Sequence, residues 1–416
     1  MSDAKKQRGL ACTREFLDFQ REWFASIQYR ASQGTPIAVV GVDTPHEILT
    51  ALDMPFVVAP WWSSVCSAKQ KDRAFFDALT GHGYPNDQTQ YIAMGFASAL
   101  APEHQPWGGL PTPSLFVSNA ATGPEHKIMQ LWAAECGAEL FTFERTTMIQ
   151  PVSAWWERID RDWESLLRTS ALDLMESEIA AFVQTAERIM GRALEPAKLA
   201  RVINRANEHG LTMREASEVL ASCPFFLADV SETIPATTIP QWHAGSEWGL
   251  YAATKLKNEL VSRRDSLSGE AEPHARLLWL GNPPWFDMNL FERLTASTNS
   301  YFVWNMYLAI AGDGYVRETS PETYFRSLAA RHGPHRDLLS SPPWNSTWIA
   351  KEAKHYKIDG AVHFVTDGGR GKEFIRRELE ASGVPVLEIE GDAVDNSLGP
   401  QNLENLITEF IHTLTH

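Results

Sequence analysis

Four residues near the C-terminus combine charge with glycine: Asp367, Gly368, Gly369 and Arg370 follow a β-prone run at residues 361–365. A carboxylate can move protons, and successive glycines can present backbone N–H groups to an anion or a carbonyl oxygen. A solvated tight turn is the competing interpretation of the same residues. We expect either a substrate-facing loop with Asp367 as a catalytic group or a turn that binds nothing.

Aromatic and hydroxyl side chains follow a second β-prone run, at residues 56–59. Trp61, Trp62, Ser63 and Ser64 come next in the sequence and are expected to form a loop at the end of the strand. An aromatic wall with hydroxyl groups suits an acyl or aryl group. Packing of the tryptophans between two lobes is the alternative.

Two further candidates for chemistry stand where helices are expected to begin. Thr89 offers a hydroxyl, and His126, next to Glu125, offers an imidazole that can carry protons near neutral pH. A helix cap for Thr89 and a solvated first turn for the pair at 125–126 are the ordinary alternatives. Trp285, in an Asn-Pro-Pro-Trp stretch, is expected to close a pocket from the second half of the chain.

Other histidines and motifs point to no cofactor. His363 lies inside an apolar run and is expected to be a core histidine with satisfied hydrogen bonds. The sequence contains no histidine–carboxylate spacing typical of zinc and no glycine-rich phosphate loop.

The elements that must position these residues alternate between strand and helix. Apolar runs expected to be strands occupy residues 37–42, 56–59, 115–118, 139–143, 277–281, 301–304, 361–365 and 384–389. Such alternation predicts an α/β fold with two doubly wound, mostly parallel sheets, whose ligands bind at the carboxyl ends of the strands. We expect an N-terminal α/β lobe with a leading helix at 1–150, a helical linking segment at 151–264 and a C-terminal α/β lobe at 265–416. Residues 196–209 and 212–222 are expected to form separate helices, and 307–344 to be irregular.

Composition limits the class of protein. The 416 residues are 44% hydrophobic and carry a net charge of −15, which argues against a nucleic-acid-binding surface. No apolar run approaches the roughly 18 residues of a membrane span, and the polar N-terminus predicts no secretory signal. Four widely spaced cysteines without a Cys-x-x-Cys pair fit a reducing cytoplasm.

Four stretches taken in order resemble the 2-hydroxyacyl-CoA dehydratases and the class I benzoyl-CoA reductase subunits. They are Thr44-Pro45-His46-Glu47-Ile48-Leu49, similar to an early Pro-x-Glu helix; residues 84–91, similar to a Tyr-Pro-x-Asp-Leu-Cys-Ser-Tyr motif; the helical stretch 192–227; and residues 359–395, which begin Asp-Gly-Ala-Val and end Glu-Gly-Asp-Ala-Val-Asp. The resemblance covers nearly the whole chain and implies the two-lobed fold.

The resemblance also implies a [4Fe–4S] cluster held by three cysteines, one from each of three loops, but here the sequence departs from the family. The three positions fall on Thr89, Gly123 and Gly369. Iron–sulfur clusters need thiolate ligands. We therefore expect a clusterless chain without a metal site, in which Gly123, Gly368, Gly369 and Arg370 line the space that the cluster vacates.

The leading interpretation is a subunit that acts on an acyl-CoA, an aromatic one included, in a non-redox hydration or dehydration. The resemblance implies a heteromeric complex with a paralogous subunit, typical of anaerobic metabolism. Substrate contacts are expected from Trp61, Trp62, Ser63 and Trp285. Two alternatives remain open: a non-catalytic scaffold for an active paralogue, and a reductase or dehydratase subunit that keeps a [4Fe–4S] cluster with unusual ligands.

Overall fold

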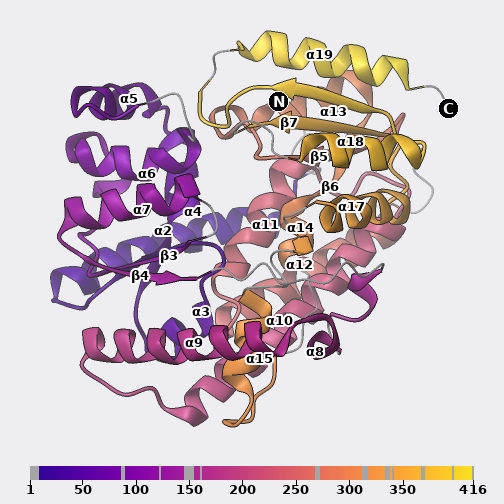
Figure 1. Ribbon diagram of the computed structural model, residues 1–416. Coiled ribbons are helices and arrows are strands. Elements are labelled where there is room, and N and C mark those ends of the chain that lie inside the picture. Colours follow the sequence, from indigo (N-terminus) through magenta and orange to yellow (C-terminus); the bar gives the residue numbers. More distant parts are fainter. Residues whose placement is uncertain are drawn as a thin grey trace.

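The computed structural model describes residues 9–85, 90–120, 123–144, 154–159, 162–267, 272–311, 317–332, 338–339, 342–366, 371–395 and 398–414. Its architecture is two α/β lobes with helices between them, and the lobes lie side by side in Figure 1, the first in indigo and purple and the second in orange and yellow.

The first lobe is built on a four-stranded parallel sheet. The strands are β1 (Ala38–Val40), β2 (Phe56–Val58), β3 (Leu115–Asn119) and β4 (Glu139–Phe143), in the order β2-β1-β3-β4. Every residue of β1 and β2 is buried, as expected for strands covered on both faces. The helices of this lobe are α2 (Ala11–Ser32), α3 (His46–Ala51), α4 (Ala59–Ala68), α5 (Asp72–Gly81), α6 (Gln90–Leu100) and α7 (Gly123–Cys136).

The second lobe repeats this topology. Its strands β5 (Arg276–Leu280), β6 (Tyr301–Asn305), β7 (Gly360–Val365) and β8 (Val386–Glu390) are parallel and ordered β6-β5-β7-β8. The helices of this lobe are α13 (Asn289–Thr298), α14 (Met306–Ala311), α17 (Trp344–His355), α18 (Lys372–Ala381) and α19 (Pro400–Thr413). A further helix, α15 (Tyr324–His332), follows β6 in the sequence, but its Tyr324, Leu328 and Ala329 pack into the hydrophobic core of the first lobe. The sequence-based prediction of two parallel-sheet lobes is therefore confirmed.

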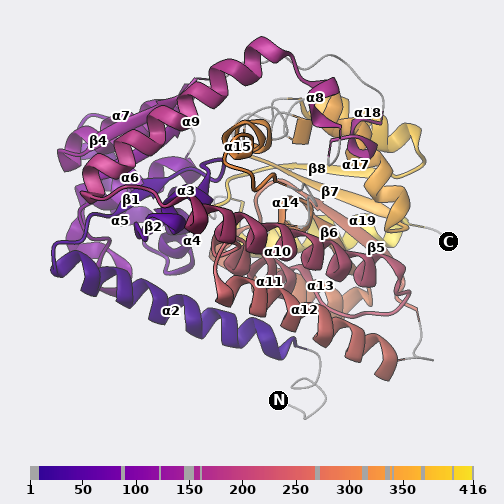
Figure 2. The same cartoon turned by 90° about the horizontal axis from the view of Figure 1, so that it is seen from below.

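Helices connect the lobes. They are α8 (Trp163–Leu166), α9 (Thr169–Met190), α10 (Pro196–Ser222), α11 (Val230–Trp242) and α12 (Glu247–Ser266). Phe182 of α9 packs against Phe141 and Phe143 of the first lobe. The C-terminal half of α10 instead shares a hydrophobic core with the second lobe, and α11 lies between the lobes (Figures 1 and 2).

Three local expectations are wrong. Residues 60–64 are not a loop, because α4 begins directly after β2 with Pro60 in its first turn, where proline is favourable. The two helices expected at 196–209 and 212–222 are one helix, α10, that runs through Gly210. The stretch 307–344 contains the helices α14 and α15. Within the described residues, no helix has both the length and the apolar character that crossing a bilayer requires.

Candidate functional site

The two sheets direct their carboxyl ends into one shared cleft of about 540 Å³. Val42 follows β1, Pro60 follows β2 and Glu125 lies in α7 after β3; all three line the cleft from the first lobe. Gly281 and Thr366, which follow β5 and β7, line it from the second lobe. The strand order changes direction between β1 and β3 in the first sheet and between β5 and β7 in the second. Open α/β sheets bind ligands at such positions.

The walls of the cleft are aromatic and apolar. Tyr91 of α6 stacks on Trp285 of the second lobe, with ring centroids 6.2 Å apart and planes 21° apart. The hydroxyl of Tyr91 donates to the carbonyl oxygen of Pro60 at 2.7 Å. Tyr307 packs edge-on against Trp285 and donates its hydroxyl to Asn282 Oδ1 at 2.9 Å. These two hydroxyls are already used to fix the walls, so the rings are held in place before a ligand binds.

Four lining residues carry a buried polar atom that has no partner among the described residues. The atoms are Trp242 Nε1, Trp285 Nε1, Asn345 Oδ1 and His363 Nδ1. An unsatisfied buried polar group costs about 1–3 kcal/mol. Two indole donors and an amide acceptor around one apolar cleft therefore favour a ligand that has both an acceptor, such as a carbonyl oxygen, and a donor, such as a hydroxyl.

The charge of the cleft is low. Burial and the nearby charge of Lys372 lower the pKa of His363 to about 4, so this imidazole is neutral near pH 7. Glu125 is the one carboxylate among the described lining residues, and none of those residues is lysine or arginine. Glu125 Oε1 lies 3.8 Å from the position that a Cβ atom on Gly41 would occupy, and Gly41 directly follows β1. A neutral apolar group suits this cleft better than a phosphate does.

The predicted aromatic contacts divide between the cleft and the core. Trp61 and Trp285 line the cleft. Trp62 is fully buried, stacks on Phe24 at 5.3 Å and donates its Nε1 proton to Ser98. Ser63 is also fully buried, and neither it nor Trp62 lines the cleft. The helix α4 explains the division, because consecutive residues of a helix face different directions.

The histidine predicted as catalytic is engaged inside the first lobe. His126 Nδ1 lies 3.1 Å from Ser118 Oγ, and its Nε2 accepts from the Gln130 amide at 3.0 Å. His126 is not among the residues that line the cleft, whereas its neighbour Glu125 is. Gly123 is the first residue of α7.

The remaining predicted residues lie outside the described part of the chain. They are Thr89, Asp367, Gly368, Gly369 and Arg370. Two described residues close to them in the sequence, Tyr91 and Thr366, line the cleft, whereas Gln90, which directly follows Thr89, does not. Convergence of Thr89, Gly123 and Gly369 on one hollow stays a prediction.

The cysteines of the chain do not fit a thiolate-held cluster at this cleft. Cys12, Cys66 and Cys223 are buried, and none of the four cysteines lines the cleft. Burial raises the pKa of Cys12 and of Cys66, and it raises the pKa of Cys136 to about 11, so these groups are thiols at neutral pH. Among the described residues no group of three or more His, Cys, Asp or Glu is placed to hold a metal ion.

Sequence reasoning missed Trp242 and Asn345 and assigned His363 to the core. Trp242 ends α11, and α11 is placed beside the cleft only by tertiary packing. For His363 a signal did exist, since it is the one ionisable residue in a strand that is otherwise apolar and fully buried.

The sequence matches a family described as 2-hydroxyglutaryl-CoA dehydratase, D-component, over residues 42–414. The chain belongs to this family. No curated protein matches the sequence at a significant level. The match begins at Val42, which follows β1 and lines the cleft, and it ends with α19, so it spans both lobes of this D-component family member.

Proposed function

We propose that this member of the D-component family is a subunit of a complex that removes water from, or adds water to, a CoA thioester. The acyl part would occupy the cleft between the lobes, and this chain would contribute no iron–sulfur cluster to the reaction. The observation that carries the proposal is the cleft itself, which lies where both parallel sheets end.

The volume and lining of the cleft support an acyl ligand. About 540 Å³ falls within the roughly 300–1,000 Å³ typical of small-molecule sites. Aromatic and aliphatic walls favour a bulky neutral acyl group, an aromatic one included. The unpartnered indole N–H groups of Trp242 and Trp285 are suited to the thioester carbonyl, and Asn345 Oδ1 to a substrate hydroxyl.

The chemistry that these groups could perform is acid–base elimination. A base removes the proton on the carbon next to the thioester carbonyl, hydroxide leaves the adjacent carbon with a proton from an acid, and an unsaturated thioester and water result. Indole N–H donors would stabilise the negative charge that develops on the carbonyl oxygen. In this scheme Glu125 is the base in the cleft, and the neutral imidazole of His363 forms a hydrogen bond with the substrate.

The loop residues predicted from the sequence complete the proposal. Asp367 and Thr89 would supply acid–base groups, and Gly368, Gly369 and Arg370 would contact the substrate where β7 ends. Thr366, directly before this loop, lines the cleft and supports this placement. We also propose the division of the chain into an N-terminal lobe, a helical linking segment and a C-terminal lobe. The substrate would lie between the two lobes. The family description supports a partner component.

A non-catalytic scaffold role is the second candidate. His126 supports it, because both of its ring nitrogens are engaged by Ser118 and Gln130. In that case the cleft would have no role in catalysis, and substitution of Glu125 would leave the activity of the complex unchanged.

The test is to purify the chain with its native partner under anaerobic conditions and to assay hydration of acyl-CoA thioesters. We expect Glu125→Gln to lower the rate by at least about 10²-fold, the lower bound for a general base, while the complex stays assembled. Glu103→Gln, an exposed carboxylate in the same lobe, is the matched control and should behave like the wild type. An unchanged rate in Glu125→Gln would exclude Glu125 as the base, and unchanged rates in Asp367→Ala and Thr89→Ala as well would establish the scaffold role.

An absorption spectrum of the chain, purified anaerobically without its partner, tests the cluster. Isolated from its partner, the chain should show no broad thiolate-to-iron absorption. Such a band in the isolated chain would show that other ligands hold iron and would overturn the clusterless proposal.

A further inference from the structure

A second hollow lies beside the cleft, on the face where α10 meets α17. It has a volume of about 280 Å³, and Leu339 lines both it and the cleft. We call it the slot. Its aromatic walls are Trp155, Trp156, Trp304, Trp348 and Tyr356.

Helical spacing creates the two sides of the slot. Arg214, Ser217 and Glu218 are three and four residues apart and form one stripe on α10. Lys351 and Glu352 lie three and four residues after Trp348 and form the facing stripe on α17.

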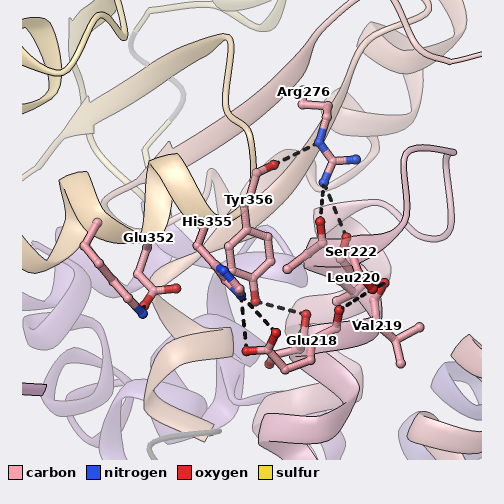
Figure 3. A network of polar contacts seen from close by, with 11 residues as sticks. Glu218, Val219, Leu220, Ser222, Arg276, Glu352, His355 and Tyr356 are labelled. Atoms are coloured by element: carbon pink, nitrogen blue, oxygen red, sulfur yellow. Dashed lines mark hydrogen bonds and ion pairs between the residues drawn. The ribbon is translucent and has the colours of Figure 1, made fainter. Parts of the chain in front are cut away.

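Hydrogen bonds at the C-terminal end of α17 hold this helix against α10. His355 Nε2 lies 3.0 Å from a carboxylate oxygen of Glu218, and the hydroxyl of Tyr356 donates to the carbonyl oxygen of Ser217 at 3.2 Å (Figure 3). The slot is therefore a fixed feature of the fold.

Indole rings from three different elements of the chain form much of the wall of the slot. Trp155 and Trp156 have ring centroids 5.8 Å apart at 74°, and Trp304 meets Trp348 at 5.8 Å and 63°. Trp155, Trp304 and Trp348 are buried, whereas Trp156 is only half-buried. Walls of this kind accept a flat ring system.

The rim carries both signs of charge. Arg214 and Lys351 supply cations, and Glu218 and Glu352 supply carboxylates. Lys351 Nζ lies 2.6 Å from Glu352, and Lys351 and Glu218 are exposed. A ligand with both an amino-substituted ring and phosphates matches this rim, since carboxylates accept from an exocyclic amine and cations bind phosphate.

We propose that the slot binds the adenine nucleotide end of the CoA thioester whose acyl end occupies the cleft. This inference rests on the proposed function. The described cleft lining offers no lysine or arginine, so the phosphates of CoA need cations from another place, and the slot supplies two next to the cleft. A volume slightly below the typical range of ligand pockets suits a single base.

The test measures dissociation constants of the full-length chain for three probes by titration calorimetry. The probes are an acyl-CoA, the same acyl group on pantetheine without the nucleotide, and adenosine 3′,5′-bisphosphate. We expect acyl-CoA to bind at least about tenfold more tightly than the acyl-pantetheine, as expected when an aromatic wall stacks on one base.

Two variants locate the nucleotide. Trp156→Ala removes a half-buried wall, and Lys351→Glu reverses an exposed charge; each should weaken acyl-CoA and adenosine bisphosphate roughly tenfold and leave acyl-pantetheine unchanged. Lys354→Glu makes the same change on an exposed residue of α17 that does not line the slot, and should bind all three probes like the wild type. The effect of Lys351→Glu should shrink at high salt.

Failure of this inference differs from failure of the proposed function. If Trp156→Ala and Lys351→Glu bind acyl-CoA like the wild type, the slot is not the nucleotide site, even when acyl-pantetheine binding supports the cleft. If the bisphosphate binds in a Lys351-dependent way but acyl-pantetheine does not bind at all, the slot stands as a nucleotide site and the assignment of the cleft fails.

Discussion

Glu47 shows how a single residue of a sequence motif acquires a physical role. It belongs to the early Pro-x-Glu stretch, and its side chain is buried in the structure. Glu47 Oε1 lies 2.6 Å from Arg317 Nε, and Oε2 lies 3.1 Å from His332 Nε2. Burial alone would raise the pKa of Glu47, but Arg317 and His332 hold it well below its usual range. The carboxylate therefore joins the first lobe to residues that follow β6.

We predict that Glu47→Gln destabilises the protein by about 3–5 kcal/mol at neutral pH, because Arg317 loses a buried carboxylate partner. The sign of the pH dependence follows from the lowered pKa in the folded state. The stabilisation is present above the unfolded pKa of about 4.5 and is lost as the pH falls through the folded value. Thermal unfolding of both proteins between pH 3.5 and 7.5 should show the difference shrinking on acidification.

Asp53→Asn is the control for this prediction. Asp53 also pairs with a cation, Lys198, but half of its side chain is exposed, and such pairs contribute at most about 1 kcal/mol. Equal losses of stability in the two variants would show that the Glu47 pair is no more than a surface contact.

Among the elements, α10 depends on one buried arginine at its end. Arg276 of β5 donates from its guanidinium to the carbonyl oxygen of Cys223 at 2.7 Å and to that of Tyr356 at 2.9 Å. It also donates to the Tyr301 hydroxyl at 2.8 Å, and its contacts with α10 are visible in Figure 3. A cation at a helix C-terminus is favourable. Arg276 thus connects α10 and α17 to the second sheet.

We expect Arg276→Met to lower stability by about 2–5 kcal/mol, since several buried carbonyl groups lose their donor. Arg276→Lys should recover only part of this loss, because an ammonium group cannot reach the same set of acceptors. Hydrogen exchange should accelerate at the last turn of α10. Arg188→Met, at an exposed ion pair with Glu139, is the control, and a similar loss there would contradict the argument.

The sequence predicts elements well where the pattern is local. The strand at Glu139–Phe143 agrees with the predicted bounds to the residue. Residues 60–64 were expected to form a loop because tryptophan and serine carry little helical signal, but Pro60 is favourable in a first helical turn. Gly210 suggested a break, although the buried face of α10 continues through it.

At the scale of the whole molecule, the candidate site follows from the repetition of one topology. Two sheets with the same strand order place their carboxyl ends on either side of one cleft, and this could be inferred from alternating strands and helices. The contribution of Trp242 could not, because it depends on how α11 lies between the lobes. Trp61 lines the cleft and Trp62 lies in the core because both belong to the helix α4, which the sequence pattern did not indicate.

The contact that joins the lobes across the cleft gives the last prediction. Trp285 of the second lobe stacks on Tyr91 of the first, and its Nε1 has no partner among the described residues. We expect Trp285→Ala to weaken binding of an acyl-pantetheine thioester roughly tenfold through loss of an aromatic wall. Trp285→Phe keeps a ring but removes the N–H donor, so an intermediate loss would assign part of the affinity to a hydrogen bond.

Trp248→Ala provides the comparison that separates binding from packing. Trp248 is a half-buried tryptophan that stacks on Phe19 with ring centroids 3.5 Å apart, and it does not line the cleft. Its removal should reduce thermal stability while leaving the dissociation constant of the thioester unchanged. If Trp285→Ala lowers stability to the same extent but binds the thioester like the wild type, Trp285 serves only to hold the lobes together. The acyl group would then have to bind elsewhere, because an acyl group in this cleft would contact the Trp285 indole that lines it.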